Sequence, residues 1–227
     1  MFKRGQVTIF VITGLVILLI IGMVYYIRYY SVSGGGFLTS SLEAENVKDY
    51  VESCLEETTL KGLIYLGEHG GYYSDKIPYF YKNNISLIED KEYLGEELNK
   101  YIKYNLGLCI KDFYYFDYEI RSGEIKTDSS FFDDKVDVDL SYHLEIVKGE
   151  KVYTLDSFNV EVDTNLNEFY DLARFITEDY IINSGWNCMT CIYDELGDFN
   201  LYILNIDEGV LYSIVDGGNY SFDFKLW

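Results

Sequence analysis

Residues 136–146, VDVDLSYHLEI, decide the fold class, because apolar and polar side chains alternate through them without interruption. An alternation of period two predicts a β-strand with one face in the core and the other in water. The turn at residues 148–151 leads into a second strand, whose Phe158, Val160 and Val162 should point inward. This pair predicts an antiparallel sheet, the kind of sheet that tolerates one solvated face.

Further strands are predicted on both sides of this pair. Upstream, we expect a strand from Tyr114 to Arg121, a turn at Ser122-Gly123 and a short return strand over residues 124–127. Near the C-terminus, Gly-, Asp- and Asn-rich turns separate three more apolar runs, as is typical of hairpins. These runs are residues 199–206, 210–215 and 220–226.

The apolar period changes to that of a helix in three other segments, residues 41–66, 90–109 and 165–183. Ser40 and Glu43 have the spacing of a capping box, and Gly67 is expected to end the first helix. The pattern therefore predicts an α+β domain over residues 41–227, with about three helices packed on an antiparallel sheet.

Four cysteines, an even number, favour two disulfides over free thiols: Cys54, Cys109, Cys188 and Cys191. We expect Cys54 to pair with Cys109, because both lie on apolar helix faces, and Cys188 with Cys191 across a small loop. A four-cysteine zinc site is the alternative, although one C-x-x-C with two isolated cysteines is only half of a zinc pattern. A thioredoxin-like role needs the first cysteine at a helix N-terminus after a strand, whereas this C-x-x-C follows a helix in a predicted loop.

Far upstream, residues 7–27 read VTIFVITGLVILLIIGMVYYI and contain no charge. A helix of this length spans roughly 30 Å, the thickness of a bilayer core. Lys3 and Arg4 precede it, which favours a cytoplasmic N-terminus and an extracytoplasmic C-terminal domain in a single-pass protein of the cell membrane. Residues 1–30 are thus predicted to be a signal anchor, and residues 31–40 a flexible Gly/Ser-rich linker.

Two other interpretations of the N-terminus involve cleavage. An ordinary secretory signal has a shorter apolar region and a small-residue cleavage site, which this chain lacks. The sequence Lys3-Arg4-Gly5-Gln6 before an apolar helix resembles the class III signals of archaeal type IV pilin-like proteins. That resemblance implies cleavage between Gly5 and Gln6 and assembly into a filament, although those signals usually have Glu where this chain has Phe10.

The start RGQVTIFVITGLVILL also resembles that of a group of uncharacterised single-pass surface proteins from small-genome (DPANN-type) archaea. The same group shares Val51-x-x-Cys54, Gly67-x-x-Gly70-Gly71-Tyr72, Cys109 and the Cys188, Cys191 pair. The resemblance implies a membrane-anchored protein of the cell surface and brings no activity with it.

Charge and composition restrict the partners. Residues 31–227 contain 15 Lys and Arg against 38 Asp and Glu, a formal charge of −23. Such a surface repels nucleic acid and anionic lipid headgroups and favours cations and basic partners. The chain also has 24 Tyr and 14 Phe, and those that are exposed could contact a glycan or a protein.

No catalytic signature is present: the chain lacks G-x-S-x-G, H-E-x-x-H and a phosphate loop, and its histidines are His69 and His143. We read His69 as part of a helix C-cap and His143 as a solvent-facing strand residue. Asp163-x-Asn165-x-Asn167 imitates the start of a calcium loop, but the later positions do not fit and an N-cap cluster is the simpler interpretation. We therefore predict no enzyme activity and no cofactor.

Weaker site candidates remain. Asn84 and Asn219 begin N-glycosylation tripeptides. The acids at 133, 134, 137 and 139 could hold a divalent cation weakly or simply form a solvated strand face.

The sequence as a whole predicts a membrane-anchored cell-surface protein that has a structural or interaction role and meets a protein partner at the cell surface. A pilin-like filament subunit is the first alternative, and an extracytoplasmic enzyme is the second.

Overall fold

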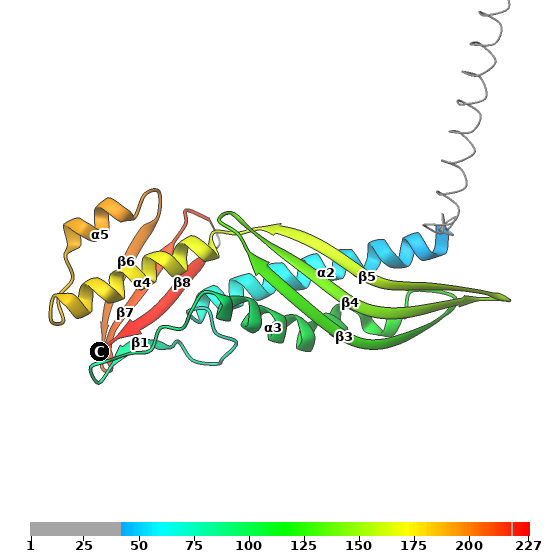
Figure 1. Ribbon diagram of the computed structural model, residues 1–227, viewed down its shortest axis with the longest axis horizontal. Helices are drawn as coiled ribbons and strands as arrows, with labels where there is room; N and C mark the ends of the chain where they lie inside the picture. Colours follow the sequence, from blue (N-terminus) through cyan, green and yellow to red (C-terminus); the bar gives the residue numbers. More distant parts are fainter. Residues whose placement is uncertain (1–41, 219) are drawn as a thin grey trace, which may run out of the picture. The chain divides into compact units, whose positions relative to one another are not determined.

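The computed structural model describes residues 42–218 and 220–227 of the chain, and Figure 1 shows its α+β architecture. Contacts divide the chain after Glu45, and the second unit, Asn46–Trp227, contains all the strands of the described part. The predicted anchor, the linker and the Gly5, Gln6 processing site lie outside the described residues. Among the helices that are described, none combines the length and the hydropathy that crossing a membrane requires.

Four α-helices and a 3₁₀ turn, η1, account for the helical part of the described chain. The helices are α2 (Leu42–Glu68), α3 (Glu92–Ile110), α4 (Leu166–Ile182) and α5 (Met189–Glu195), and η1 covers Lys111–Phe113. The strands are β1 (Tyr79–Lys82), β2 (Ile85–Ser86), β3 (Glu119–Phe131), β4 (Lys135–Lys148), β5 (Lys151–Asp163), β6 (Asn200–Ile206), β7 (Gly209–Val215) and β8 (Ser221–Leu226).

The first sheet is antiparallel and has the order β3-β4-β5. The alternation that predicted β4 is confirmed, because its apolar side chains at 136, 138, 140, 142, 144 and 146 are all buried. Helix α3 packs along β3, and their backbones approach closely at Gly95, where a Cβ atom would lie 2.5 Å from the carbonyl oxygen of Ser129. The hydroxyl of Ser129 on β3 donates to Oδ1 of Asn99 on α3 at 2.8 Å, which adds a hydrogen bond to the contact between this helix and strand.

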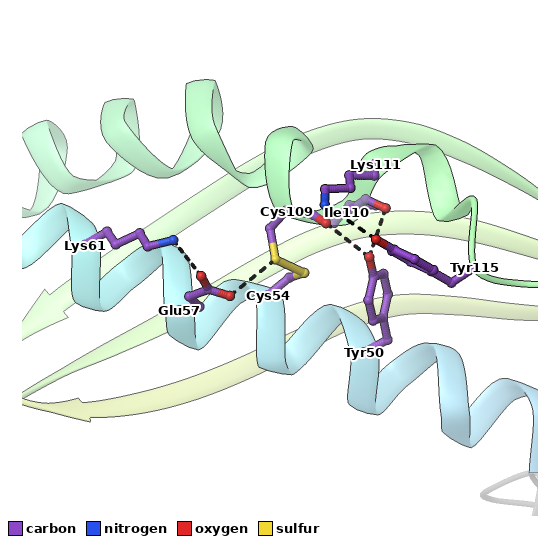
Figure 2. The surroundings of a disulfide bond; sticks show 8 residues. All are labelled: Tyr50, Cys54, Glu57, Lys61, Cys109, Ile110, Lys111 and Tyr115. Atoms are coloured by element: carbon purple, nitrogen blue, oxygen red, sulfur yellow. Dashed lines mark hydrogen bonds and ion pairs between the residues drawn. A yellow bond between two sulfur atoms is a disulfide. The ribbon is translucent and has the colours of Figure 1, made fainter.

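Helix α2 lies beside α3, and the disulfide between Cys54 and Cys109 joins them (Figure 2). The two Cα atoms are 5.6 Å apart, within the usual range for a disulfide. The Tyr50 hydroxyl lies 3.0 Å from the carbonyl oxygen of Cys109 and 3.1 Å from that of Ile110, so α2 also supplies a donor for the end of α3. The pairing expected from the sequence is the one found.

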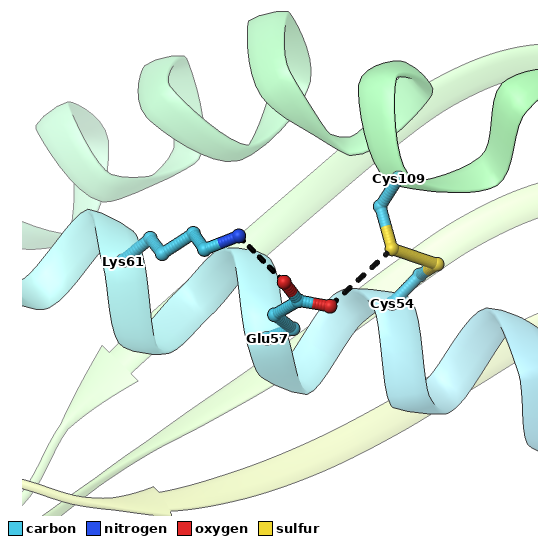
Figure 3. A network of polar contacts seen from close by, with 4 residues as sticks. All are labelled: Cys54, Glu57, Lys61 and Cys109. Carbon is cyan, nitrogen blue, oxygen red and sulfur yellow. Dashed lines mark hydrogen bonds and ion pairs between the residues drawn. A yellow bond between two sulfur atoms is a disulfide. The ribbon is translucent and has the colours of Figure 1, made fainter.

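An exposed ion pair flanks this disulfide on α2 (Figure 3). Lys61 donates to Oε1 of Glu57 at 2.5 Å, and the pKa of the Glu57 carboxyl is lowered by that hydrogen bond. Oε2 of Glu57 lies 3.8 Å from the sulfur of Cys109, which is a van der Waals contact because a disulfide sulfur carries no proton. An exposed pair of this kind contributes little to stability, so the covalent link is the dominant tie between α2 and α3 at this point.

The second sheet has the order β2-β1-β8-β7-β6, and α4 covers one of its faces. The ring of Tyr170 on α4 lies 6.0 Å from the rings of both Phe80 and Phe222 in edge-to-face contacts. The C-terminal end of α2 reaches this sheet too, because a Cβ atom at Gly67 would lie 2.2 Å from the carbonyl oxygen of Ser221. Helix α2 therefore contributes to both halves of the domain.

The expectation of a purely antiparallel sheet is wrong for the second sheet, because β1 runs parallel to β8. Strand β1 was not expected, because residues 76–87 contain the chain's single proline, Pro78, and have the turn-rich composition of a loop. Pro78 precedes the strand, and its carbonyl oxygen accepts the Lys225 amide hydrogen at 2.9 Å, so proline does not prevent the pairing. The helix count of about three is also too low, because α5 was expected to be loop.

The predicted turn at Ser122-Gly123 is wrong as well. Strand β3 runs continuously from Glu119 to Phe131, with a register irregularity between Ser122 and Ile125. A Cβ atom at Gly123 would lie 3.3 Å from Cβ of His143 on β4, so this glycine permits a bulge within a strand rather than a reversal. The strand that was predicted to begin at Tyr114 begins at Glu119 instead, after η1 and a turn.

Removal of the Cys54–Cys109 disulfide is expected to destabilise the domain strongly. In the chain-entropy model the double variant Cys54→Ser/Cys109→Ser loses about 4 kcal/mol of unfolding free energy, because the bond closes a long loop. The matched variant Cys188→Ser/Cys191→Ser opens a much shorter loop and loses about 2 kcal/mol. Urea unfolding of both variants measures the difference, and equal losses would contradict the assignment.

Two glycines of α3 offer a matched test of its packing on β3. Gly95→Ala should cost about 1–3 kcal/mol, because the methyl group is forced against the Ser129 carbonyl oxygen. Gly107→Ala should stabilise the domain by about 0.5–1 kcal/mol, because a Cβ atom there meets nothing within 4 Å and alanine favours the helix. Thermal unfolding of the two variants should therefore shift in opposite directions.

Candidate protein-binding surface

Exposed large apolar side chains are concentrated in one part of the described chain. Nineteen such side chains are exposed among the described residues, and nine of them fall between Ile181 and Ile206. Scattered apolar side chains on a surface are normal, but a concentration of them marks an interaction site. Residues 181–206 comprise the last residues of α4, α5 and strand β6.

The first part of this surface is carried by the connection between α4 and α5. We call it the α4–α5 rim and define it by Ile182, Trp186, Met189 and Tyr193. Trp186 is 80% exposed, Ile182 78%, Tyr193 77% and Met189 52%. Trp, Tyr and Met are enriched at protein interfaces because they present large apolar areas, so the composition favours contact with a protein.

The rim is held in place by polar contacts beneath it. Oδ2 of Asp179 accepts the backbone N–H of Cys188 at 2.7 Å. Asn187 donates to the carbonyl oxygen of Ile176 at 2.9 Å and accepts a hydrogen bond from the Tyr212 hydroxyl on β7. The connection is therefore anchored both to α4 and to the second sheet, which presents the rim side chains to solvent in a fixed arrangement.

The disulfide between Cys188 and Cys191 closes this connection, with Cα atoms 5.2 Å apart. The sequence placed the pair in a loop, but Cys188 is the N-cap of α5 and its sulfur accepts the Cys191 amide hydrogen at 3.3 Å. Seven residues are too few to show a helical period, which is why the helix was missed. The preceding element is still a helix, and the carboxylate of Asp179 beside Cys188 disfavours a thiolate, so the contacts support a structural bond rather than a redox centre.

Strand β6 is the second part of the surface. It stands at the end of the second sheet and pairs with β7 at all seven of its positions, from Asn200 opposite Val215 to Ile206 opposite Gly209. Six of its seven residues are exposed, and Tyr202 and Leu204 are each more than half exposed. Both faces of the strand therefore meet solvent.

Tyr212 on β7 connects strand β6 with the α4–α5 rim. It lies directly opposite Ile203 of β6, its ring stacks on Phe224 at 5.3 Å, and its hydroxyl reaches Asn187 under the rim. Burial of the hydroxyl, with Tyr180 and Asp179 nearby, raises its pKa to about 12. The neutral hydroxyl is thus the form that the folded domain stabilises.

The segment of chain that carries this surface is acidic, and the nearby cations are Lys82 and Lys225 beside the ring of Tyr79, whose hydroxyl donates to Glu208. Between Arg174 and Lys225 the chain has nine Asp and Glu residues and no Lys, Arg or His. A cavity of about 710 Å³ lies beside the start of β6, and its lining includes Glu168, Asp171, Glu195, Asp198 and Asp216 but no basic residue. The surroundings therefore favour a basic partner over an acidic one.

The structure brings together no metal site from the other candidate residues. Among residues 42–218 and 220–227, no group of three or more His, Cys, Asp or Glu side chains is arranged to hold a metal. Asp137 and Asp139 both accept from Nδ2 of Asn159, at 2.6 and 3.1 Å. Asn165 is the N-cap of α4 without a side-chain bond, and Thr164 accepts the Leu166 amide hydrogen instead.

The histidines and the glycosylation candidates also have local roles. Nδ1 of His69 lies 2.8 Å from the carbonyl oxygen of Tyr65, and its ring stacks on the Tyr65 ring at the end of α2. His143 contacts Asp156 at 2.6 Å on the exposed face of β4, and this hydrogen bond raises its pKa. Asn84 is exposed in the β1–β2 turn with a φ of 63°, whereas Asn219 lies outside the described residues.

Comparison of the chain with protein-family models, with curated proteins and with solved structures finds no match. The assignment of a function therefore depends on the geometry of the domain itself.

The candidate surface was only partly visible in the sequence. Strand β6 was expected as a strand, but its place at the sheet edge depends on the order of the strands in space. A signal that could have indicated it is the uncharged run NLYILNI, residues 200–206, within a long segment that lacks basic residues.

The Tyr212 hydroxyl should make the domain sensitive to alkaline pH. Because its pKa is raised above the usual 10, its stabilisation is complete below pH 10 and is lost as the pH rises toward 12. At pH 8 the Tyr212→Phe variant should be about 1 kcal/mol less stable than the unmodified chain, because Asn187 loses its hydrogen-bond donor. Between about pH 10 and 11.5 the variant should lose less stability than the unmodified chain does, because it has no hydroxyl at position 212 to ionise. Urea unfolding at a series of pH values measures both effects, and parallel curves for the two proteins would contradict the assignment.

Proposed function

We propose that this protein is a single-pass membrane-anchored surface protein whose extracytoplasmic domain binds a partner protein and has no catalytic role. The anchor would be the uncharged run at residues 7–27, with the N-terminus in the cytoplasm. The observation that carries the interaction role is the concentration of exposed apolar side chains between Ile181 and Ile206, over a connection that is hydrogen-bonded to α4 and β7.

The cysteines support the extracytoplasmic location. All four cysteines of the chain are in disulfides, one joining α2 to α3 and one closing the start of α5. Disulfides persist in oxidising compartments and are rare in the reducing cytosol. A domain that depends on them is therefore suited to the outer side of the membrane.

The properties of the surface support a protein partner. The rim offers Trp, Tyr and Met side chains, which contribute most to protein interfaces, and the surrounding carboxylates keep it soluble when it is unoccupied. Nucleic acid is disfavoured as a partner because the segment from Phe175 to Phe224 contains no cation.

A site-specific photo-crosslinker tests the interaction role in cells that make the full chain in its own membrane. A photoreactive phenylalanine in place of Tyr193 should form an adduct of one defined mass, because this rim position meets the partner. The matched control replaces Tyr104, which is 69% exposed on α3, and should form none. Equal adducts at both positions, or none at Tyr193 and Trp186, would contradict the role of the rim.

The same cells test the location of the domain. In intact cells a membrane-impermeant maleimide should label no cysteine before treatment with an impermeant reductant, and should label cysteines freed by the reductant afterwards. Labelling that requires permeabilised cells would overturn the extracytoplasmic assignment.

A further inference from the structure

We propose that the free edge of β6 accepts an extended segment of the partner protein as an additional strand, and that this segment is apolar in its middle and basic at its ends. The inference rests on the interaction role proposed above and names the chemistry of the partner. Four observations on the described residues carry it: the position of β6, its composition, its exposure and the charges at its two ends.

Strand β6 forms one edge of the second sheet. In the order β2-β1-β8-β7-β6, strand β6 is terminal, and in the described part of the chain no strand or backbone group is hydrogen-bonded to the edge that faces away from β7. The pairing with β7 has no register irregularity, so β6 is regular along its whole length. Helix α5 packs on α4, and among the described residues no backbone hydrogen bond joins it to this edge. A regular strand with an unpaired row of N–H and C=O groups is a template for another strand.

The other strand edges of the domain are protected, and β6 is not. Strand β2 has two residues, which is too short to serve as a template. Strand β3 has five charged residues and a bulge, and β5 has four charged residues beside an irregularity in its pairing with β4. Charges, bulges and short length are the features by which natural sheets prevent unwanted pairing. Strand β6, with the sequence NLYILNI, has no charge, no proline and no bulge.

Exposure shows that an added strand would find side chains to contact on both faces. On one face β6 presents Tyr202, Leu204 and Ile206, which are 58%, 55% and 39% exposed. On the other face it presents Leu201 and Ile203, opposite the buried Ile214 and Tyr212 of β7. Cross-strand contacts between apolar side chains stabilise a sheet, so an apolar partner strand would extend the existing core outward.

The charges at the two ends of β6 decide which strand fits. Asp198 precedes the strand, and Asp207 and Glu208 follow it. Strands that pair place their flanking residues close together, and like charges directly opposite each other are destabilising. A partner segment with Lys or Arg at both ends would meet opposite charge at each end of β6.

A second copy of this chain fits this edge poorly. If two β6 strands paired antiparallel about a two-fold axis near Ile203, Asp198 of one copy would face Asp207 or Glu208 of the other, at both ends of the pair. The partner is therefore another polypeptide with basic flanks rather than this chain itself.

The test uses the full chain in detergent micelles and a synthetic peptide with seven consecutive valine and isoleucine residues and two lysines at each end. This peptide should bind, and amide hydrogen exchange should slow at alternate residues of β6, because only every second N–H faces the added strand. Two control peptides separate the contribution of the charges from that of the backbone hydrogen bonds. One has glutamates in place of the lysines, and the other has consecutive methylated backbone nitrogens. The first should bind at least about tenfold more weakly, and the second should not bind.

A matched pair of protein variants tests the charges. The triple variant Asp198→Asn/Asp207→Asn/Glu208→Gln should bind the lysine-flanked peptide about tenfold more weakly than the unmodified chain. The control variant Glu124→Gln/Asp128→Asn/Glu150→Gln changes the net charge equally on the three-stranded sheet and should bind as the unmodified chain does. All six side chains are exposed or lie at turns, so both variants should fold.

Three results would overturn the proposal. Binding of the methylated peptide would show that no strand is added. Slowed exchange elsewhere than in β6 would place the peptide on another surface. Slowed exchange in β6 that appears with rising protein concentration alone would identify a second copy as the occupant. If the photo-crosslinker at Tyr193 still yields its adduct in any of these cases, the interaction role stands and the strand addition alone fails.

Discussion

The close contact between α2 and α3 is the interaction on which the rest of the domain depends. At Gly62 a Cβ atom would lie 2.8 Å from Cδ1 of Leu98 and 2.9 Å from Cδ1 of Tyr101, so side chains of α3 pack directly against the backbone of α2. The Cys54–Cys109 disulfide and the Tyr50 hydroxyl then hold the other end of the contact. Because α3 packs on β3 while the end of α2 packs on β8, this helix pair connects the two sheets.

The second sheet combines a well-packed face with an unprotected edge. Phe80, Tyr212, Phe222 and Phe224 are buried between the sheet and α4, whereas β6 is exposed on both faces one strand away from this core. A strand edge that is regular, apolar and uncharged can pair with a strand of another chain, and most proteins protect such edges with charges, bulges or covering elements. The partner protein that we propose would cover both this edge and the rim of exposed Trp, Tyr and Met side chains. In that proposal the acidic residues at the ends of β6 would favour a basic partner and disfavour pairing with a second copy.

How far the sequence predicted the fold varied with the strength of each local signal. Strand β4 and helices α2, α3 and α4 were predicted within a few residues, because each is long and one of its faces is buried. Strand β1 and helix α5 were missed, since four and seven residues are too short for a period and turn-forming residues flank them. Gly123 was misread as a turn because a glycine that relieves crowding within a strand has the same local appearance as one that reverses the chain.

By itself the sequence determined most local conformations and the overall chemistry: the α+β class, the acidic surface, four cysteines of which two lie on apolar helix faces, and an uncharged run long enough for a membrane helix. Only the tertiary structure decided that β6 is an edge, that β1 pairs parallel with β8, and that the rim is exposed. The physical reason is that hydrophobic period is a property of neighbouring residues, whereas strand order and exposure depend on contacts between segments far apart in the chain. Those contacts are selected by the packing of the whole domain.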